Sequence, residues 1–178
     1  MQLIIVVEAD KISKTDYIYI NKYLNRFFVI GNDVKISPVY MGGKDNYKAR
    51  RVEIEIERLS RNYRAQHEKN GLSIVLLCVD TDDLACGVDA KENESKMSEI
   101  VNYCKLNDYE IVWFCRDTEE VFLNRRVTKK EKKILAERFK NTDLDKLNIE
   151  KLRMANYGIC KAGTSNLDLV LNKYLLRK

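Results

Sequence analysis

The feature that most constrains the fold of this chain is an alternation of short apolar runs with longer amphipathic segments. Four of the apolar runs have the length of a strand: Leu3 to Val7, Val34 to Tyr40, Ser73 to Val79 and Tyr109 to Cys115. Continuous runs of branched residues are typical of parallel strands that are buried on both faces. Parallel strands need long crossover connections, which are usually helices. The pattern therefore predicts an α/β domain with a mostly parallel central sheet of about four strands flanked by helices.

Two of these runs also predict their own place in the sheet. Pro38 removes a hydrogen-bond donor from the second run, so this strand is expected at an edge or to end there. The run from Ser73 to Val79 is the most apolar stretch of the chain and is expected in the centre.

The segments between and after the strands carry the spacing of amphipathic helices. Helices are expected over residues 15–28, 47–69 and 94–106, from Thr128 onward and from Ser165 onward. Thr128 with Glu131 has the pattern of a capping box, and Ser165 with Asp168 resembles one. The 178 residues suit a single domain. Within it, residues 1–123 are expected to form the α/β core and residues 124–178 a helical C-terminal extension packed on that core.

Composition narrows the class of protein. The 32 basic and 27 acidic side chains leave a net charge of +5, which is too small to identify a polyanionic partner. The chain opens without a basic leader and with a short apolar run, so we expect no signal peptide, no membrane span and a cytoplasmic location. The five cysteines lack a CxxC pair and are expected to be reduced core residues. With His67 as the single histidine, catalytic triads and histidine-based metal sites lose support.

Acidic residues follow the predicted strands. Glu8 follows the first, Asp80 and Asp82 follow the third, and Glu119 and Glu120 come just after the fourth. The carboxyl ends of parallel strands form one edge, where α/β folds bind ligands. If strand geometry continues past Asp80, Asp82 points the same way. Two carboxylates about 4 Å apart repel by about 4 kcal/mol at an effective dielectric of about 20, and a divalent cation would reverse this.

Oxygen ligands of this kind favour Mg²⁺ or Mn²⁺. The alternative is that these acids are turn formers and helix caps without a ligand.

A strand that ends in glutamate, with a later apolar strand that ends in Asp-x-Asp, resembles the Toprim domain of topoisomerases, primases and OLD-type nucleases. Within that group the chain is most similar to the RloB family of small phage-resistance proteins. That family has a Lys-Thr-acidic step after the glutamate, and this chain has Lys14, Thr15 and Asp16. Toprim proteins usually have glycine directly after the glutamate, and this chain has Ala9.

A further segment carries the resemblance, which spans residues 3 to 123. Where the RloB family has Asn-Pro-x-x-Glu-x-Trp-Leu, residues 116–123 read RDTEEVFL. Glu120 and Leu123 match, Phe122 replaces the tryptophan, and the Asn-Pro pair is missing.

The resemblance implies a Toprim or Rossmann-like fold and metal-dependent phosphodiester chemistry on DNA or RNA, in prokaryotic phage defence. Asp80 and Asp82 would hold Mg²⁺ or Mn²⁺, and Glu8 would act as a metal ligand or as a general acid/base. Glu120 would help to orient the metal cluster, or would simply be an acid at a helix N-terminus. A partner protein such as an ATPase is a further expectation.

Nucleic acid would need positive charge near this edge of the sheet. The candidate contacts are Lys14, Arg125, Arg126, Lys129, Lys130 and Lys133. All but the first belong to one basic stripe, which could follow a phosphate backbone. The alternative is an ordinary solvated helix face.

Three rival functions stay open. The first is a binding or regulatory component of a defence system that has lost catalysis. The second is a nucleotide-binding α/β module, which is disfavoured because neither GxxxxGK[ST] nor GxGxxG occurs. The third is a thiol enzyme, which is disfavoured because no cysteine has a histidine nearby in the sequence.

Overall fold

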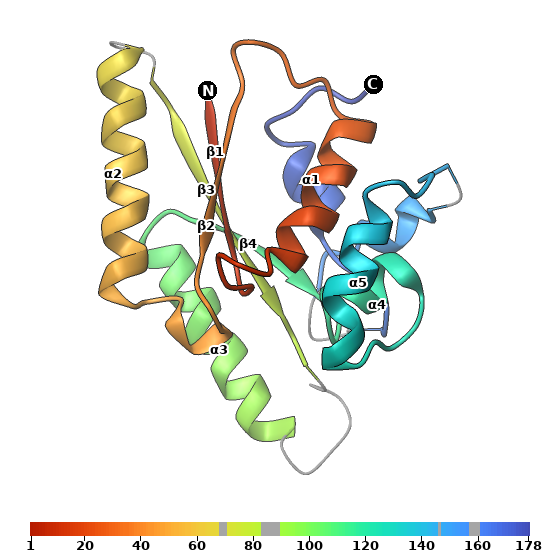
Figure 1. Cartoon of the computed structure of the whole chain (residues 1–178). Coiled ribbons are helices and arrows are strands. Elements are labelled where there is room, and N and C mark those ends of the chain that lie inside the picture. Colours follow the sequence, from red (N-terminus) through yellow and green to blue (C-terminus); the bar gives the residue numbers. More distant parts are fainter. Residues whose placement is uncertain (68–70, 83–89, 146, 157–160) are drawn as a thin grey trace.

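The computed structural model describes residues 1–67, 71–82, 90–145, 147–156 and 161–178. Its centre is one sheet of four parallel strands (Figure 1). The strands are β1 (Gln2–Val7), β2 (Lys35–Tyr40), β3 (Ser73–Asp80) and β4 (Glu110–Phe114), in the order β2-β1-β3-β4. The predicted α/β fold with a four-stranded parallel sheet is confirmed.

The positions expected for two strands are also confirmed. β2 lies at an edge, where Pro38 pairs with Ile5 of β1 and no further strand needs its missing N–H group. β3 lies between β1 and β4. All six residues of β1 are buried, as expected for a strand covered on both faces.

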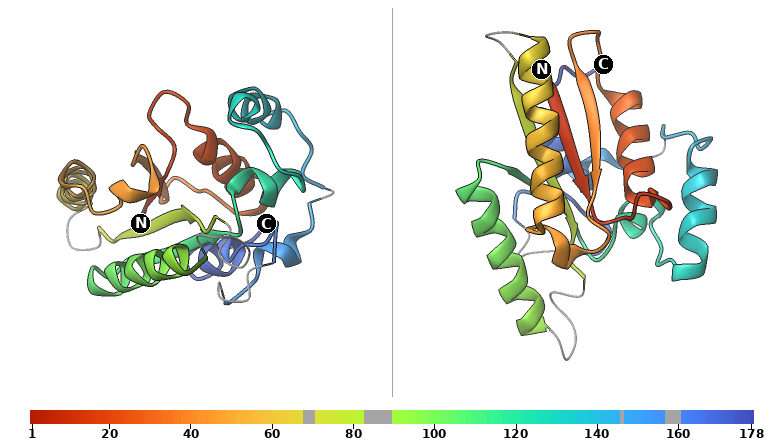
Figure 2. Two further views of the ribbon diagram at one scale, coloured as in Figure 1. Left: turned by 90° about the horizontal axis from the view of Figure 1, so that it is seen from below. Right: turned by 60° about the vertical axis from the view of Figure 1, so that its left-hand side comes forward.

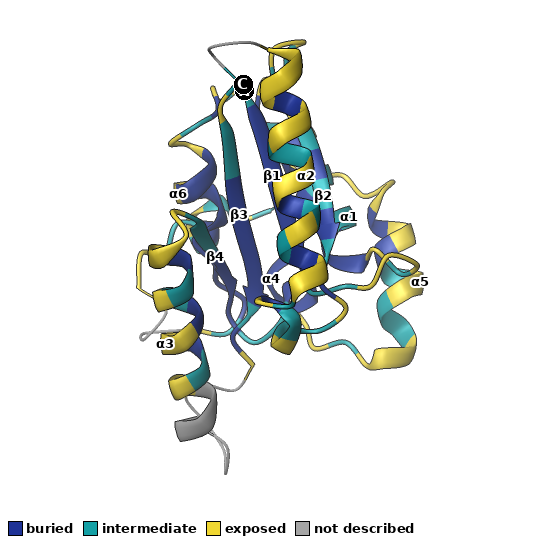
Figure 3. Ribbon diagram, turned by 90° about the vertical axis from the view of Figure 1, so that its left-hand side faces the viewer, coloured by how far each residue is buried: buried dark blue, intermediate teal, exposed yellow. Residues whose placement is uncertain are grey.

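Helices cover both faces of the sheet (Figures 1 and 2). The α-helices are α1 (Thr15–Phe27), α2 (Arg50–Gln66), α3 (Ala90–Leu106), α4 (Thr118–Leu123), α5 (Lys129–Phe139) and α6 (Leu167–Leu171). The 3-10 helices include η1 (Lys44–Asn46) and η3 (Ile149–Leu152). The apolar side chains of α2 and α3 form one core with the sheet, and those of α1, α4, α5 and α6 form the other. Figure 3 shows the exposed stripe of α2 turned away from the sheet.

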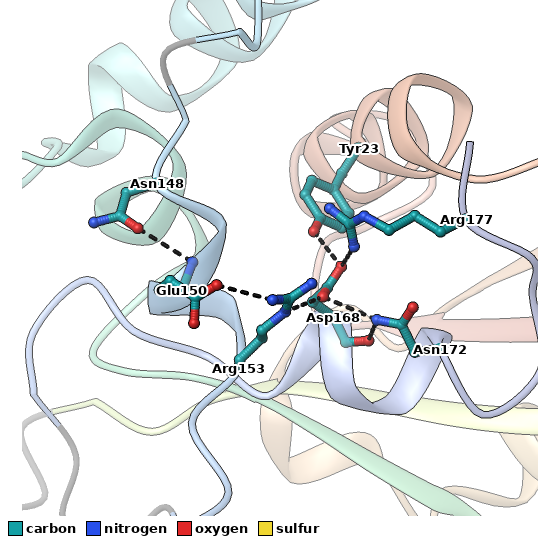
Figure 4. Close-up of polar contacts among 7 residues, drawn as sticks. All are labelled: Tyr23, Asn148, Glu150, Arg153, Asp168, Asn172 and Arg177. Carbon is teal, nitrogen blue, oxygen red and sulfur yellow. Dashed lines mark hydrogen bonds and ion pairs between the residues drawn. The ribbon is translucent and has the colours of Figure 1, made fainter.

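Of the two capping patterns expected at helix N-termini, one forms and the other does not. Thr128 and Glu131 form the predicted capping box of α5. The last helix, however, ends at Leu171 and has Asn166 at its N-cap, and Ser165 and Asp168 do not form a capping box. The hydroxyl oxygen of Ser165 accepts from the N–H of Leu167, the first residue of α6 (3.1 Å), and the hydroxyl donates to the carbonyl of Trp113 (2.6 Å). Asp168 is fully buried and binds Tyr23 on α1, because tertiary partners compete with local capping (Figure 4).

The cysteines depart from the expectation in one position. Cys78 and Cys104 are free and buried, as predicted for core residues. Cys115, at the end of β4, takes part in a disulfide, so the expectation that all five cysteines are reduced is wrong there. Cys86 and Cys160 lie outside the described residues.

Within the described ranges, none of the helices combines the length and the apolar character needed to cross a membrane.

Candidate carboxylate and lysine site

The candidate site lies where the chain changes its direction of travel across the sheet. From β1 the chain adds β2 on one side, and it then crosses to the other side of β1 to form β3. Open α/β sheets bind ligands at the carboxyl ends of strands at such a switch point. Glu8 follows β1 there, and Asp80 ends β3. The backbone N–H of Asp80 donates a hydrogen bond of 2.7 Å to Oε1 of Glu8.

A hollow of about 480 Å³ opens at this point, and we call it the carboxylate hollow. Its acidic lining includes Glu8, Asp16 and Asp80, and its basic lining includes Lys129 and Lys132 from α5. The remaining lining residues are Ala9, Asp10, Ser13, Thr15, Gly42 and Gly43. Residues from the end of β3, from α1 and α5, and from the loops after β1 and β2 thus meet around one cavity.

A glycine brings the loop after β2 to this cavity. The N–H of Gly43 donates to the carbonyl of Glu8 at 2.8 Å, and its φ of 117° lies in a region that residues with a Cβ rarely adopt.

Asp80 is held by the start of α4. Its Oδ1 accepts hydrogen bonds from the backbone N–H of Thr118 (3.0 Å) and from the Thr118 hydroxyl (2.9 Å). Burial raises the pKa of the Asp80 carboxyl well above its usual range, and the nearby Glu8 and Asp16 raise it further. A carboxyl group in this setting favours either a proton or a nearby cation.

Glu8 has a pKa of about 8, compared with 4.5 for an ordinary glutamate. Burial is the main cause, and the positive charge of Lys44 and the hydrogen bond from Asp80 oppose it in part. A glutamate with this pKa can hold or release a proton near neutral pH.

Asp16 belongs to the same group, although the sequence analysis did not place it in the site. It is buried, and its Oδ2 accepts from the N–H of Ala9 at 2.8 Å. Burial raises its pKa as well. The available signal was the Lys-Thr-acidic step of the RloB resemblance, in which Asp16 is the acid.

Lys44 is the second residue that sequence reasoning missed. Its side chain is only 12% exposed, and its ammonium group donates to the carbonyl of Asp80 (2.8 Å) and pairs with the carboxylate of Asp82. The one sequence signal was its place directly after the Gly42-Gly43 turn. Lys44 therefore supplies positive charge between the ends of β1 and β3.

Asp82 is not placed as strand geometry would place it. β3 ends at Asp80, and Asp82 has a φ of 52°, in the left-handed region. Its side chain is 56% exposed and lies against Lys44. Strand geometry therefore does not continue past Asp80, and the condition under which Asp80 and Asp82 would point the same way is not met.

The two glutamates after β4 have separate surroundings. Glu119 is fully buried, and its Oε2 accepts from the Lys132 ammonium at 2.7 Å. Glu120 faces Arg116 (3.2 Å) and is not among the residues that line the carboxylate hollow. In the part of the chain that the structure describes, Glu119 Oε1 and Glu120 Oε2 are buried without a hydrogen-bond partner.

The predicted basic residues also lie in different surroundings. Lys129 lines the carboxylate hollow, and Lys130 and Lys133 are exposed on the same helix. Arg125 lies 3.7 Å from Glu131, and Arg126 is exposed just before α5. Lys14 lines a different hollow, between α1, β2 and α5.

The residue types fit a hard divalent cation, because Glu8, Asp16 and Asp80 offer carboxylate oxygens whose raised pKa values favour a positive partner. The arrangement is not a closed ligand shell. Among the described residues, no group of three or more His, Cys, Asp or Glu side chains is placed to hold a metal ion.

No family model, no curated protein and no solved structure matches this chain. The resemblance to Toprim and RloB proteins therefore stays a prediction from the motifs quoted above.

Proposed function

We propose that this chain carries out metal-dependent phosphodiester chemistry on nucleic acid, as a Toprim-type nuclease in phage defence. One observation supports the proposal above all. The carboxylates of Glu8, Asp16 and Asp80 line the same hollow as Lys129 and Lys132, at the carboxyl edge of a parallel sheet. Carboxylates that can hold Mg²⁺ or Mn²⁺, next to lysines that can meet phosphate oxygens, are the groups that such a reaction needs.

The roles of the residues follow from their surroundings. A divalent cation held mainly by Asp80 and Glu8 would stabilise negative charge on a phosphoryl oxygen. Where Glu8 does not itself hold the cation, it can act as the general acid/base, because its pKa of about 8 lies near neutral pH. Asp82 would serve as an outer ligand once Lys44 moves away from it. Lys129, exposed on α5, is placed to contact the substrate phosphate.

The test is calorimetry with Mn²⁺ on the intact protein and on Glu8→Gln and Asp80→Asn. Asp45→Asn is the matched control, because Asp45 is an exposed acid on η1 that pairs with Lys96. We expect binding that is lost in both site variants and kept in the control. Cleavage of labelled DNA and RNA oligonucleotides by the same proteins then tests the chemistry.

A second candidate function is a catalytically inactive binding or regulatory component. The observation that favours it is Lys44, whose ammonium already pairs with the carboxylate of Asp82 and offsets the charge of Glu8, which reduces the need for a metal ion. It predicts no Mn²⁺ binding by the intact protein, together with nucleic-acid binding that survives loss of Asp80 and Asp82.

A partner ATPase and a cytoplasmic location remain predictions from the sequence.

A further inference from the structure

A second hollow, of about 690 Å³, lies beside the candidate site. We call it the tyrosine groove, and its lining includes Lys14, Tyr17, Asn21, Pro38 and Tyr40. It lies between α1, β2 and the end of α5, and α1 and α5 run side by side in Figure 1. Ser13 lines both this groove and the carboxylate hollow, so the two are neighbours across one loop.

Two aromatic rings give the groove its apolar character. Tyr17 of α1 and Tyr40 of β2 are both half-buried, with ring centroids 6.3 Å apart and planes at 82°. In an edge-to-face pair of this kind, the edge of one ring packs against the face of the other, so the two rings are not stacked on each other. Burial raises the pKa of Tyr40 to about 12 and raises that of Tyr17, so both rings are neutral at physiological pH. Neutral aromatic rings at a groove can stack with nucleic-acid bases.

The rim of the groove is basic. Lys14 is exposed and precedes α1 with a φ of 53°, and in the described ranges its ammonium has no ion-pair partner. The other two lysines of the groove are engaged: Lys22 donates to the carbonyl of Lys140 (2.7 Å), and Lys140 pairs with Glu137 (2.6 Å). Lys14 is therefore the lysine of this groove that is available to meet a phosphate.

We propose that the tyrosine groove binds a single-stranded nucleic acid, with a base against Tyr17 and Tyr40 and a backbone phosphate against Lys14. The proposal rests on the proposed function, since it extends the substrate path from the carboxylate hollow across Ser13. An unpaired strand is favoured over a duplex, because only unstacked bases can reach aromatic side chains. α5 supplies charge but no aromatic contact to this path, and α1 and β2 supply the rings.

The test is fluorescence anisotropy with labelled single-stranded DNA and RNA oligonucleotides, in EDTA so that no metal site contributes. We expect Tyr17→Leu and Tyr40→Leu each to weaken binding at least about fivefold, the lower range for loss of one base stack. Tyr17→Phe is the matched control and should bind as the intact protein does, because it keeps the ring. A duplex of the same sequence should bind more weakly than the single strand.

Lys14→Ala is a second, independent variant. Because the Lys14 side chain is exposed, its removal should change the stability of the fold little. We expect it to weaken binding and to lower the slope of log affinity against log salt by about one phosphate contact. Lys105→Ala is the control, because Lys105 is an exposed lysine of α3, on the opposite face of the sheet. Its affinity and salt slope should be those of the intact protein.

The outcomes separate this proposal from the proposed function. Failure of the intact protein to bind either single strand in EDTA would contradict nucleic-acid binding by the tyrosine groove. Equal affinities of Tyr17→Leu and Tyr17→Phe would contradict it as well. Mn²⁺ calorimetry on Tyr17→Leu should match the intact protein. Loss of Mn²⁺ binding in Glu8→Gln and Asp80→Asn, with none in Tyr17→Leu, would support the metal site independently of nucleic-acid binding by the groove.

Discussion

Oε1 of Glu8 accepts a hydrogen bond of 2.7 Å from the backbone N–H of Asp80. This bond joins the carboxyl ends of β1 and β3, which are neighbours in the sheet. Because a backbone group fixes Glu8, a substitution of the Asp80 side chain leaves that bond in place. Asp80 in turn is held by Thr118. Each carboxyl group can therefore be tested separately.

The pH dependence of stability follows from Glu8. Its pKa is about 8 in the folded protein and 4.5 in an ordinary glutamate. Between these values the folded state keeps a proton that the unfolded state has released. The stability from this proton is fully present below about pH 4.5 and is lost as pH rises through about 8, at up to about 1.4 kcal/mol per pH unit.

Urea unfolding between about pH 5 and pH 8 measures this effect. The free energy of unfolding should fall with rising pH, and in Glu8→Gln this free energy should fall less steeply. The pKa values of Asp16 and Asp80 are raised too, so some slope should persist in the variant. If the free energy of unfolding of Glu8→Gln falls with pH as steeply as that of the intact protein, the role given to Glu8 is wrong.

Lys44 is the next residue to test. Lys44→Met removes the ammonium that contacts Asp80 and Asp82, and the carboxylates nearby lose their counter-charge. We expect a loss of about 2 kcal/mol in the free energy of unfolding, below the full cost of breaking a buried pair because Asp82 is 56% exposed. Calorimetry should show tighter Mn²⁺ binding by this variant than by the intact protein.

Lys48→Met is the control for Lys44. Lys48 pairs with Glu99 at the surface, where both side chains are more than half exposed. Its loss should leave the free energy of unfolding nearly unchanged, because solvent screens an exposed ion pair. Weaker Mn²⁺ binding by Lys44→Met than by Lys48→Met would show that Lys44 assists the metal site instead of competing with it.

The strands, and the acids at their carboxyl ends, could be predicted because continuous apolar runs indicate buried strands. The edge position of β2 could be predicted because Pro38 lacks an N–H group. The position of Lys44 could not be predicted in this way. It approaches Asp80, which lies 36 residues away in the sequence, only because β2 and β3 both pair with β1, and the register of such pairing is not encoded by local pattern. The conformation of Asp82 was missed for a related reason, since its N–H binds the carbonyl of Arg116 on a separate segment.

The length of the last helix shows the same limit. The apolar spacing after Ser165 is helical, yet α6 ends at Leu171, and tighter bonds follow it, from the N–H of Lys173 to the carbonyl of Val170 and from that of Tyr174 to Leu171. The predicted capping pair is also engaged elsewhere, since Asp168 binds side chains from other parts of the chain. A capping pattern in sequence states which local bonds are available. It does not state which distant partners compete for the same atoms.

The ion pair between Lys132 and Glu119 gives a further prediction. Glu119 is fully buried, and the pair has a separation of 2.7 Å. Lys132→Met would leave Glu119 without its cation, so we expect a loss of about 3 kcal/mol in the free energy of unfolding. The double variant with Glu119→Gln should recover part of this loss, because no unpaired charge then remains buried. Additive losses in thermal or urea unfolding would show that the two residues act independently.

The last prediction concerns the buried cluster around Asp168 (Figure 4). Its Oδ1 accepts from the Tyr23 hydroxyl (2.5 Å) and from Arg177 (2.6 Å), and its Oδ2 accepts from Arg153 (2.7 Å). Asp168→Asn removes the charge that both arginines face, so we expect a loss of about 3 to 5 kcal/mol in the free energy of unfolding.

The control is Glu150→Gln. Glu150 also pairs with Arg153, but its side chain is 76% exposed, so its loss should cost under about 1 kcal/mol. Because Tyr23 lies on α1 and Arg177 lies near the C-terminus, Asp168→Asn should also increase hydrogen exchange in both segments. If exchange rises in α6 alone, Asp168 stabilises its own helix and does not tie the C-terminal segment to α1.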